Sequence, residues 1–207
     1  SAQNFGDLQW ANANPDIKMN DAIVEAENIY IGYKYYETRY FDTVMNQGNA
    51  SSTVGSSTGS AWNYDDEVTY PFGYGLSYTT FTQTLDDLHV DLENETVTAK
   101  VTVTNTGSVA GKDVVQLYYT APYIAGEIEK SGVELGAFAK TKELQPGESE
   151  EVTLTVPVEK MASYDAYDAN HNGFTGYELD AGDYIFTVRH DAHNVDDDAN
   201  ATITCSL

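Results

Sequence analysis

Apolar and polar residues alternate strictly in several segments of the second half of the chain. Residues 96–104 read Thr-Val-Thr-Ala-Lys-Val-Thr-Val-Thr, with Val97, Ala99, Val101 and Val103 on one face. Because successive side chains of a strand point to opposite sides, this pattern predicts a strand with one buried face. Six further segments show a similar strand-like composition: 85–92, 114–119, 133–144, 152–156, 184–189 and 201–205.

Turn-forming residues separate these segments. Asn105-Thr106-Gly107, Gln145-Pro146-Gly147 and Asp180-Ala181-Gly182 each stand between two strand patterns. Short strands with one buried face, spaced by such turns, are typical of a two-sheet antiparallel sandwich. The sequence therefore predicts a mainly β fold, an immunoglobulin-like antiparallel β-sandwich of about seven strands over residues 81–207.

The first 80 residues have a different texture. Residues 20–27 could form a short helix with Asn20 as its N-cap, and an aromatic run follows at 29–36. This region is too short to bury a core of its own, so we expect it to pack on something else. Residues 44–69 are rich in Gly, Ser, Thr and Asn at their centre and show no period, which predicts a long loop.

Residues 70–81 read Tyr-Pro-Phe-Gly-Tyr-Gly-Leu-Ser-Tyr-Thr-Thr-Phe. Pro71 fixes one φ angle, Gly73 and Gly75 permit tight backbone paths, and the aromatic rings can wedge a junction between domains. These features predict a rigid linker. The segment closely resembles the motif that joins the α/β sandwich domain of family 3 glycoside hydrolases to their fibronectin-type-III-like domain.

The flanking segments agree with this resemblance, which covers the chain from about residue 25 to its end. Asn28 departs from the family, which usually has Gly at this position. The resemblance implies that residues 1–80 are the C-terminal tail of the α/β sandwich domain and that residues 81–207 are the fibronectin-III-like domain. The matching segments are 27–38, 101–107, 111–119, 135–148 and 179–184.

Family 3 enzymes are retaining exo-acting β-glycosidases, most often β-glucosidases. Retention requires two carboxyl groups about 5–5.5 Å apart; in this family the nucleophile lies on a (β/α)8 barrel and the acid/base usually lies earlier in the α/β domain. Neither motif occurs here, and neither Trp10 nor Trp62 follows an aspartate. The resemblance therefore implies no catalytic residue. It implies a non-catalytic piece whose partners are the barrel, the rest of the α/β domain and a β-glucoside or oligosaccharide substrate.

One segment matches the first half of a calcium loop. Asp168, Asn170 and Asn172 place oxygen ligands at alternate positions, and Gly173 follows for the turn. The twelfth position, where a bidentate Glu belongs, holds a leucine, so Glu178 would supply the carboxylate one residue early, and Asp165 could contribute. The alternative is a polar hairpin turn, because Asn-Gly is a strong turn signal. Calcium is the one cofactor that the sequence suggests.

The predicted loop also carries two aromatic residues of interest. Flat apolar rings stack on sugar faces, and the resemblance implies that this loop leaves the domain that forms part of the active-site wall. Trp62 and Tyr64 are therefore candidate substrate contacts. The alternative is that both rings pack against the barrel or lie in a disordered loop.

For three other sets of residues, the sequence indicates a structural role. Residues 190–198 combine two histidines with aspartates, but their spacing indicates a solvated loop rather than a metal site. Glu148, Glu150 and Glu151 lie where alternation turns charged residues outward. Cys205, the single cysteine, falls on the apolar face of the last strand and is expected to behave as a small buried hydrophobe.

The charge balance excludes several kinds of partner. There are 33 Asp and Glu against 10 Lys and Arg, a net charge of −23, which repels nucleic acid and anionic membranes. The sequence leaves open a bacterial cytoplasmic or a secreted location. Two competing functions also remain: a stand-alone carbohydrate- or surface-binding module, with Tyr118, Tyr119 and Tyr123 as candidate aromatics, and an adhesion domain. The linker motif argues against the adhesion domain, and alternation sends Tyr118 and Tyr119 to opposite faces.

Overall fold

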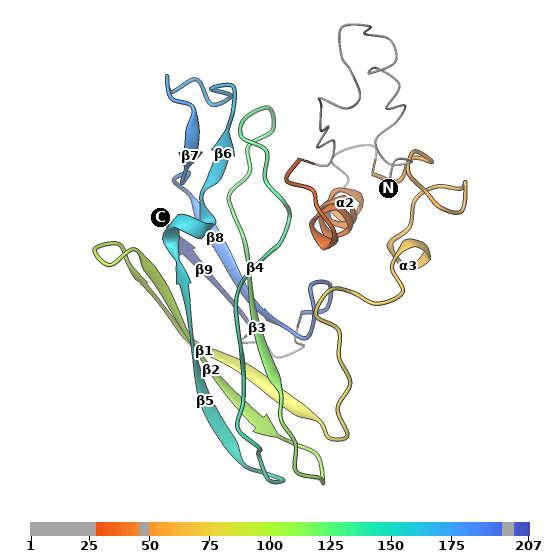
Figure 1. The fold of residues 1–207 in the computed structure, drawn as a ribbon, viewed down its shortest axis with the longest axis vertical. Coiled ribbons are helices and arrows are strands. Elements are labelled where there is room, and N and C mark those ends of the chain that lie inside the picture. Colours follow the sequence, from red (N-terminus) through yellow and green to blue (C-terminus); the bar gives the residue numbers. More distant parts are fainter. Residues whose placement is uncertain (1–27, 46–49, 196–200) are drawn as a thin grey trace, which may run out of the picture. The chain divides into compact units, whose positions relative to one another are not determined.

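The computed structural model describes residues 28–45, 50–195 and 201–207 (Figure 1). The chain divides into two compact units, residues 1–70 and residues 71–207, and each is described by itself. The helix predicted at residues 20–27 lies outside the described residues.

The second unit is a two-sheet antiparallel sandwich, as predicted. One sheet has three strands and the other has four, and every neighbouring pair is antiparallel. All seven strands expected from the sequence are present. In spatial order they are β1 (Phe81–Asp91), β2 (Thr96–Asn105) and β5 (Ser149–Pro157) in the first sheet, and β4 (Glu134–Lys140), β3 (Val114–Thr120), β8 (Asp183–Arg189) and β9 (Thr202–Ser206) in the second.

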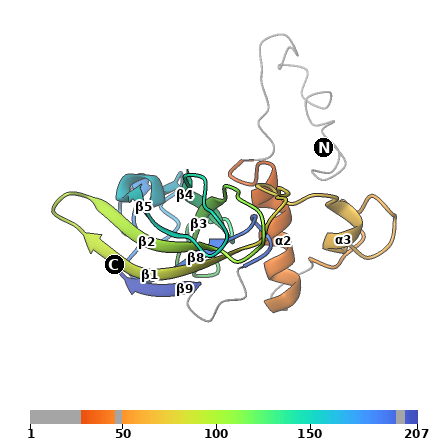
Figure 2. The same cartoon turned by 90° about the horizontal axis from the view of Figure 1, so that it is seen from below.

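The alternating residues of β2 form the centre of the core. Val97, Ala99, Val101 and Val103 are completely buried, which confirms the predicted inner face. They pack in one cluster with inward side chains of the second sheet, including Phe186. Figure 2 shows the sandwich from below, with the β1–β2 hairpin extending beyond the other strands.

Cys205 packs against the edge of this cluster from β9, as its place in the alternation predicted. Burial, with a smaller contribution from the negative charge of Asp183, raises the pKa of its thiol. A thiol with a raised pKa is a poor nucleophile, so the side chain serves packing.

A second, smaller hairpin surrounds the Asn172-Gly173 turn, where the sequence offered a polar hairpin turn as the alternative to a calcium loop, but its strands were not predicted. Strands β6 (Ser163–Asp165) and β7 (Gly176–Glu178) form a two-stranded sheet after the short 3-10 helix η1 (Val158–Met161). The rings of Tyr164 and Tyr177 meet edge to face across it, with 5.0 Å between their centroids. Strands of three residues are too short to show an alternating pattern, so no sequence signal marked them.

The described residues of the first unit form two helices that were not predicted, α2 (Tyr33–Met45) and α3 (Tyr64–Glu67). Segment 44–69, expected as an irregular loop, therefore contains a helical turn, whose N-cap Asn63 accepts a hydrogen bond from the Asp65 N–H. Asn28 has a φ of +49°. Asn is one of the few residues besides Gly that adopts this conformation readily, which explains how it can stand where the family usually has Gly.

Candidate functional site

The linker, residues 71–80, belongs to the same compact unit as the sandwich. Its backbone is attached at both ends. The Ala192 N–H donates to the Phe72 carbonyl over 2.8 Å, and the Thr106 N–H donates to the Thr80 carbonyl over 2.9 Å. Because the two attachments lie eight residues apart, they restrict the whole path between them.

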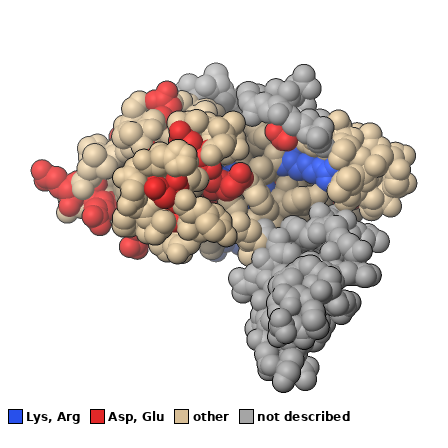
Figure 3. All heavy atoms as spheres, turned by 90° about the horizontal axis from the view of Figure 1, so that it is seen from above, with Lys and Arg blue, Asp and Glu red and all other residues tan. Residues whose placement is uncertain are grey.

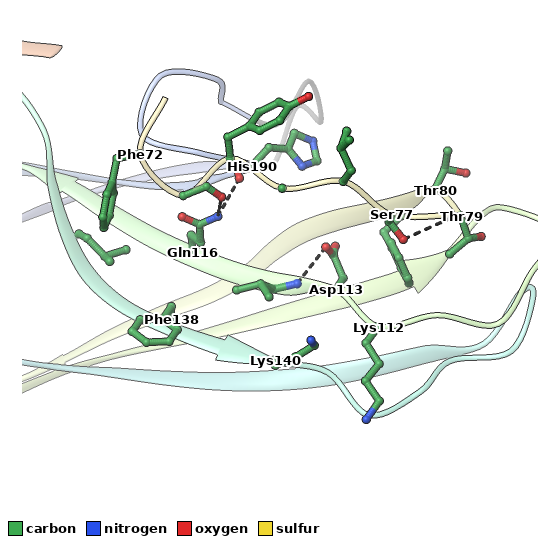
Figure 4. Close-up of a pocket in the computed structure, with 17 residues that line it drawn as sticks. Phe72, Ser77, Thr79, Thr80, Lys112, Asp113, Gln116, Phe138, Lys140 and His190 are labelled. Atoms are coloured by element: carbon green, nitrogen blue, oxygen red, sulfur yellow. Dashed lines mark hydrogen bonds between the residues drawn. The ribbon is translucent and has the colours of Figure 1, made fainter. Parts of the chain in front are cut away.

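A buried glutamine of β3 fixes the middle of this path. Gln116, 6% exposed, donates from Nε2 to the carbonyls of Gly73 over 3.1 Å and His190 over 2.7 Å. Figure 4 shows Gln116 reaching from β3 toward the linker. Gly73 has a φ of +86°, and a Cβ there would lie 2.1 Å from Gln116 Oε1. Only glycine combines this backbone angle with so close an approach.

A buried asparagine makes the second attachment. Asn105 at the end of β2 is completely buried, and its Nδ2 donates to the carbonyls of Val109 and Leu144. Its Oδ1 accepts the Thr79 hydroxyl over 2.8 Å and the Gly107 N–H over 3.0 Å. Every polar atom of the amide is therefore used, and Asn105 ties the end of the linker to the end of β2 and to the connections at Val109 and Leu144.

The linker backbone is thus fixed, but its apolar side chains remain in solvent. Leu76 is 88% exposed and Tyr78 is 100% exposed. Leu76 borders a groove of about 720 Å³ that lies between the linker and strands β3 and β4 (Figure 4). We call the exposed apolar side chains of the linker, together with Phe138 across the groove, the linker surface; its members are Phe72, Tyr74, Leu76, Tyr78 and Phe138. An exposed apolar set of this kind on a rigid backbone is typical of a protein contact surface.

The two candidate sugar platforms, Trp62 and Tyr64, are buried in the first unit, at 3% and 5% exposure. The Tyr64 hydroxyl donates to the Glu37 carboxylate, and the Arg39 guanidinium lies 4.8 Å from the centroid of the Trp62 ring. Both rings therefore hold the segment around α3 against α2. Direct contact with a substrate stays a prediction. The partners on α2 lie more than 20 residues away in sequence, so no local pattern could reveal this packing.

The predicted calcium residues lie in the connection between β6 and β7. Glu178 Oε2 accepts the side-chain amide of Asn170 over 3.2 Å and also that of Asn172. Asp168 closes the turn by accepting the Gly173 N–H at Oδ1 over 2.9 Å. Asn170, Asn172 and Glu178 are therefore brought into direct contact. Over the described residues, no three His, Cys, Asp or Glu side chains converge on a metal position, so any cation here would need the two amides as ligands.

Asp165, the possible additional ligand, has another role. Burial alone would raise its pKa, but hydrogen bonds from backbone amides, foremost those of Tyr167 and Ala169, outweigh that effect and lower it. The two oxygens accept these N–H groups over 2.9 Å and 2.7 Å. The carboxylate therefore stabilises the start of the loop.

The remaining candidates have structural roles. Tyr118 and Tyr119 are both buried, so neither can contribute to an exposed aromatic row. Glu148 pairs with Lys142 over 2.8 Å at the surface, and this hydrogen-bonded partner lowers the pKa of Glu148. Asp191 accepts backbone N–H groups of the turn that follows it, at His193 and Asn194. Residues 196–198, named with the histidines, lie outside the described residues.

On the face drawn in Figure 3, acidic side chains are scattered in several groups and basic side chains are few. This distribution agrees with the net charge of −23. No helix in the part of the chain that the structure describes has the length and hydropathy of a membrane span.

Comparison with known proteins shows which domain family and which enzymes the chain matches. Residues 113–192 match the family model of the fibronectin type III-like domain. The chain is 38% identical over 183 residues to beta-glucosidase A of Butyrivibrio fibrisolvens, a match that covers 81% of this chain and 19% of that protein.

Solved structures agree. Beta-glucosidase 3B from Thermotoga neapolitana, in complex with α-D-glucose, matches with a TM-score of 0.62 and 35% identity, over 95% of this chain and 22% of that one. The GH3 beta-glucosidase of Bifidobacterium adolescentis matches with a TM-score of 0.61 and 26% identity, over 95% and 24%. The chain thus spans about a quarter or less of each of these proteins. By sequence and fold it belongs to the family 3 glycoside hydrolases, as the segment that contains their fibronectin type III-like domain.

Proposed function

We propose that this chain is a non-catalytic, accessory part of a retaining exo-β-glycosidase that removes terminal β-linked glucose or a related sugar. Residues 1–80 supply the tail of the α/β sandwich domain, and the sandwich supports the catalytic domains. The observation that carries this proposal is the linker surface: a backbone clamped by Gln116 and Asn105, with Leu76 and Tyr78 turned to solvent. The beta-glucosidases that match the chain over most of its length support the activity of the whole enzyme.

A rigid, apolar linker suits a supporting role for a physical reason. A flexible linker would leave the domains free to move, and each contact would then cost the entropy of ordering the chain. A linker whose backbone is already fixed by side chains of the sandwich has lost that freedom before it meets a partner. Docking the linker surface on the catalytic domains therefore fixes their geometry at little further entropic cost.

The first test is hydrolysis of an aryl β-glucoside by the purified chain, with the intact mass verified in the same sample. We expect no turnover, since no pair of carboxylates with the two catalytic motifs occurs in the sequence. Turnover by a preparation of a single correct mass would refute the accessory role.

A second test concerns the docking of the linker surface. In the whole enzyme, we expect Leu76→Ser combined with Tyr78→Ser to lower Tm and kcat/KM, because each side chain contributes about 1.5–3 kcal/mol when buried by a partner. The matched control is Leu92→Ser with Tyr123→Ser, which changes two exposed residues of the same types elsewhere on the sandwich. Equal Tm values for the two double variants would show that the linker surface docks on nothing.

We also propose that segment 44–69 forms part of the active-site wall, with Trp62 and Tyr64 acting by fixing its backbone. Their burial supports this indirect role. Tyr64→Phe removes the hydroxyl that donates a hydrogen bond to Glu37 but keeps the ring. In the whole enzyme it should raise KM for an aryl glucoside. An unchanged KM in both Tyr64→Phe and Trp62→Phe would exclude a wall formed by these residues.

The alternative, a carbohydrate-binding module, is favoured by one observation. The β6–β7 hairpin and its loop expose four aromatic side chains: Tyr164, Tyr167, Phe174 and Tyr177. Aromatic rings of this kind can stack on sugars. Affinity electrophoresis in gels containing soluble β-glucan would retard the chain, and Tyr177→Ala would abolish the retardation. Identical mobility with and without glucan would eliminate this function.

A further inference from the structure

The connection between β6 and β7 has the residue spacing of the first half of a cation-binding loop. Asp168 stands at position one, Asn170 at position three, Asn172 at position five and Gly173 at position six of the calcium-loop spacing. The Asn172 N–H donates to Asn170 Oδ1 over 3.2 Å, and the Phe174 N–H donates to Asn172 Oδ1 over 2.8 Å. These bonds fix both side chains. Each amide oxygen accepts a single hydrogen bond here and keeps a second lone pair.

The observation that points to a ligand is one oxygen of Glu178. Its Oε2 holds the amides of Asn170 and Asn172, but its Oε1 is buried and has no hydrogen-bond partner. A desolvated carboxylate oxygen with no donor or positive charge is costly, and buried charges are normally paired or coordinate a metal. The Oε1 atom therefore lacks the compensation that its environment requires.

Within the described part of the chain, no ion pair to a basic side chain provides that compensation. The pairs Lys100–Glu151, Lys130–Asp180 and Lys142–Glu148 include neither Asp168 nor Glu178. Asp168 contributes a second carboxylate, since its Oδ1 is used by Gly173 and its Oδ2 remains. The loop thus combines two carboxylates and two amide oxygens without a neighbouring cation.

We propose that the β6–β7 loop binds one calcium ion through oxygen atoms of Asp168, Asn170, Asn172 and Glu178. All four are hard oxygen ligands, which calcium prefers, and waters complete the six to eight ligands that it takes. The twelfth position holds Leu179 instead of a bidentate Glu. With fewer protein ligands than a full calcium loop, the site has a Kd on the order of 10⁻⁴ M. The bound ion ties β7 to the loop and orders the exposed rings of Tyr167 and Phe174.

The first experiment measures calcium binding to the protein by isothermal titration calorimetry in about 0.1 M KCl, which screens the diffuse acidic surface. We expect one saturable site. Glu178→Gln retains the acceptor for the two asparagine amides but removes the charge, and it should weaken binding at least tenfold. Glu151→Gln is the matched control, because Glu151 is an exposed acid on β5. Equal affinities for the two variants, or no saturable heat at about 1 mM calcium, would overturn the proposal.

A second experiment needs no variant. Chymotrypsin cleaves after exposed aromatic residues, and Tyr167 is 92% exposed within the loop. Calcium should slow cleavage at Tyr167 and Phe174 at least fivefold, whereas magnesium at the same concentration should not, because it demands octahedral geometry and dehydrates reluctantly. Cleavage at Tyr123, outside the loop, monitors the protease itself. Equal cleavage rates in calcium and magnesium would contradict the site even if Glu178→Gln fails to fold.

Discussion

The hydrogen bond between Gln116 and the Gly73 carbonyl gives a quantitative prediction for Gly73→Ala. An alanine at this position, where φ is +86°, pays about 1–2 kcal/mol for a left-handed backbone. Its Cβ would also lie 2.1 Å from Gln116 Oε1, so the glutamine must move away. Gln116 then loses its hydrogen bonds to the Gly73 and His190 carbonyls, each worth about 0.5–1.5 kcal/mol. We therefore expect a total destabilisation of about 2–5 kcal/mol.

The matched control is Gly147→Ala. Gly147 has a φ of +79°, close to that of Gly73, but nothing lies within 4 Å of a Cβ built there. This variant pays the backbone cost alone, about 1–2 kcal/mol. The difference between the two variants therefore measures the contact with Gln116 and removes the backbone contribution.

The assay is equilibrium unfolding in urea, followed by tyrosine fluorescence and far-ultraviolet circular dichroism. In a Gln116→Ala background, Gly73→Ala should cost no more than Gly147→Ala, because the atom that it would meet is gone. A double-mutant cycle should thus give a coupling of about 2 kcal/mol. If Gly73→Ala and Gly147→Ala destabilise the wild-type protein equally, the contact with Gln116 is not the reason that position 73 requires glycine.

Three further predictions concern the sandwich. Asn105→Ala removes the amide that donates to the Val109 and Leu144 carbonyls, so it should lower the free energy of unfolding in urea by about 2–4 kcal/mol. Asn94→Ala, at an exposed position, should lower it by under about 0.5 kcal/mol. Similar losses in the two variants would contradict the attachment of the linker by Asn105. Burial, together with the negative charge of Asp180, raises the pKa of Tyr184 to about 12, above the value of about 10 in an unfolded chain. The stability that this neutral phenol contributes is complete below pH ~10 and is lost as the pH rises toward 12. The urea midpoint should therefore fall less steeply between pH 9 and 11.5 in Tyr184→Phe than in the wild type. Parallel pH profiles of the two midpoints would refute this. Phe186→Ala opens the core between the sheets and should cost about 3–5 kcal/mol by urea unfolding, against less than 1 kcal/mol for the half-exposed Ile185→Val on the other face of β8.

The sandwich could be predicted from sequence because its signal is local. In β2 and β5, inward valines and leucines alternate with outward threonines and acids, and the two strands pair Val97 with Val156 and Ala99 with Leu154 in register. A period of two is visible within a single segment of five residues or more. The seven longer strands were all found, whereas β6 and β7, with three residues each, were anticipated only through the Asn-Gly turn between them.

The missing parts depend on contacts between residues far apart in sequence. Helix α2 is rich in aromatic residues and lacks a clear apolar stripe, so its sequence resembled a strand or a loop as much as a helix. The rings of Trp62 and Tyr64 were candidate substrate contacts, and they are covered because Arg39 and Glu37 meet them from α2. Gln116 stands at a polar position within β3, and only the fold shows that its partner is the linker.

The two side-chain amides that bind the linker affect where domains of such enzymes can be exchanged. Gln116 and Asn105 lie within the sandwich, but each makes one of its hydrogen bonds to the linker, at residues 73 and 79. A chimera that joined a foreign domain directly before Phe81 would remove these two partners and leave each buried amide with one hydrogen bond fewer. A junction placed before Pro71 would carry the clamped segment along intact. The transferable module therefore starts ten residues earlier than its first strand.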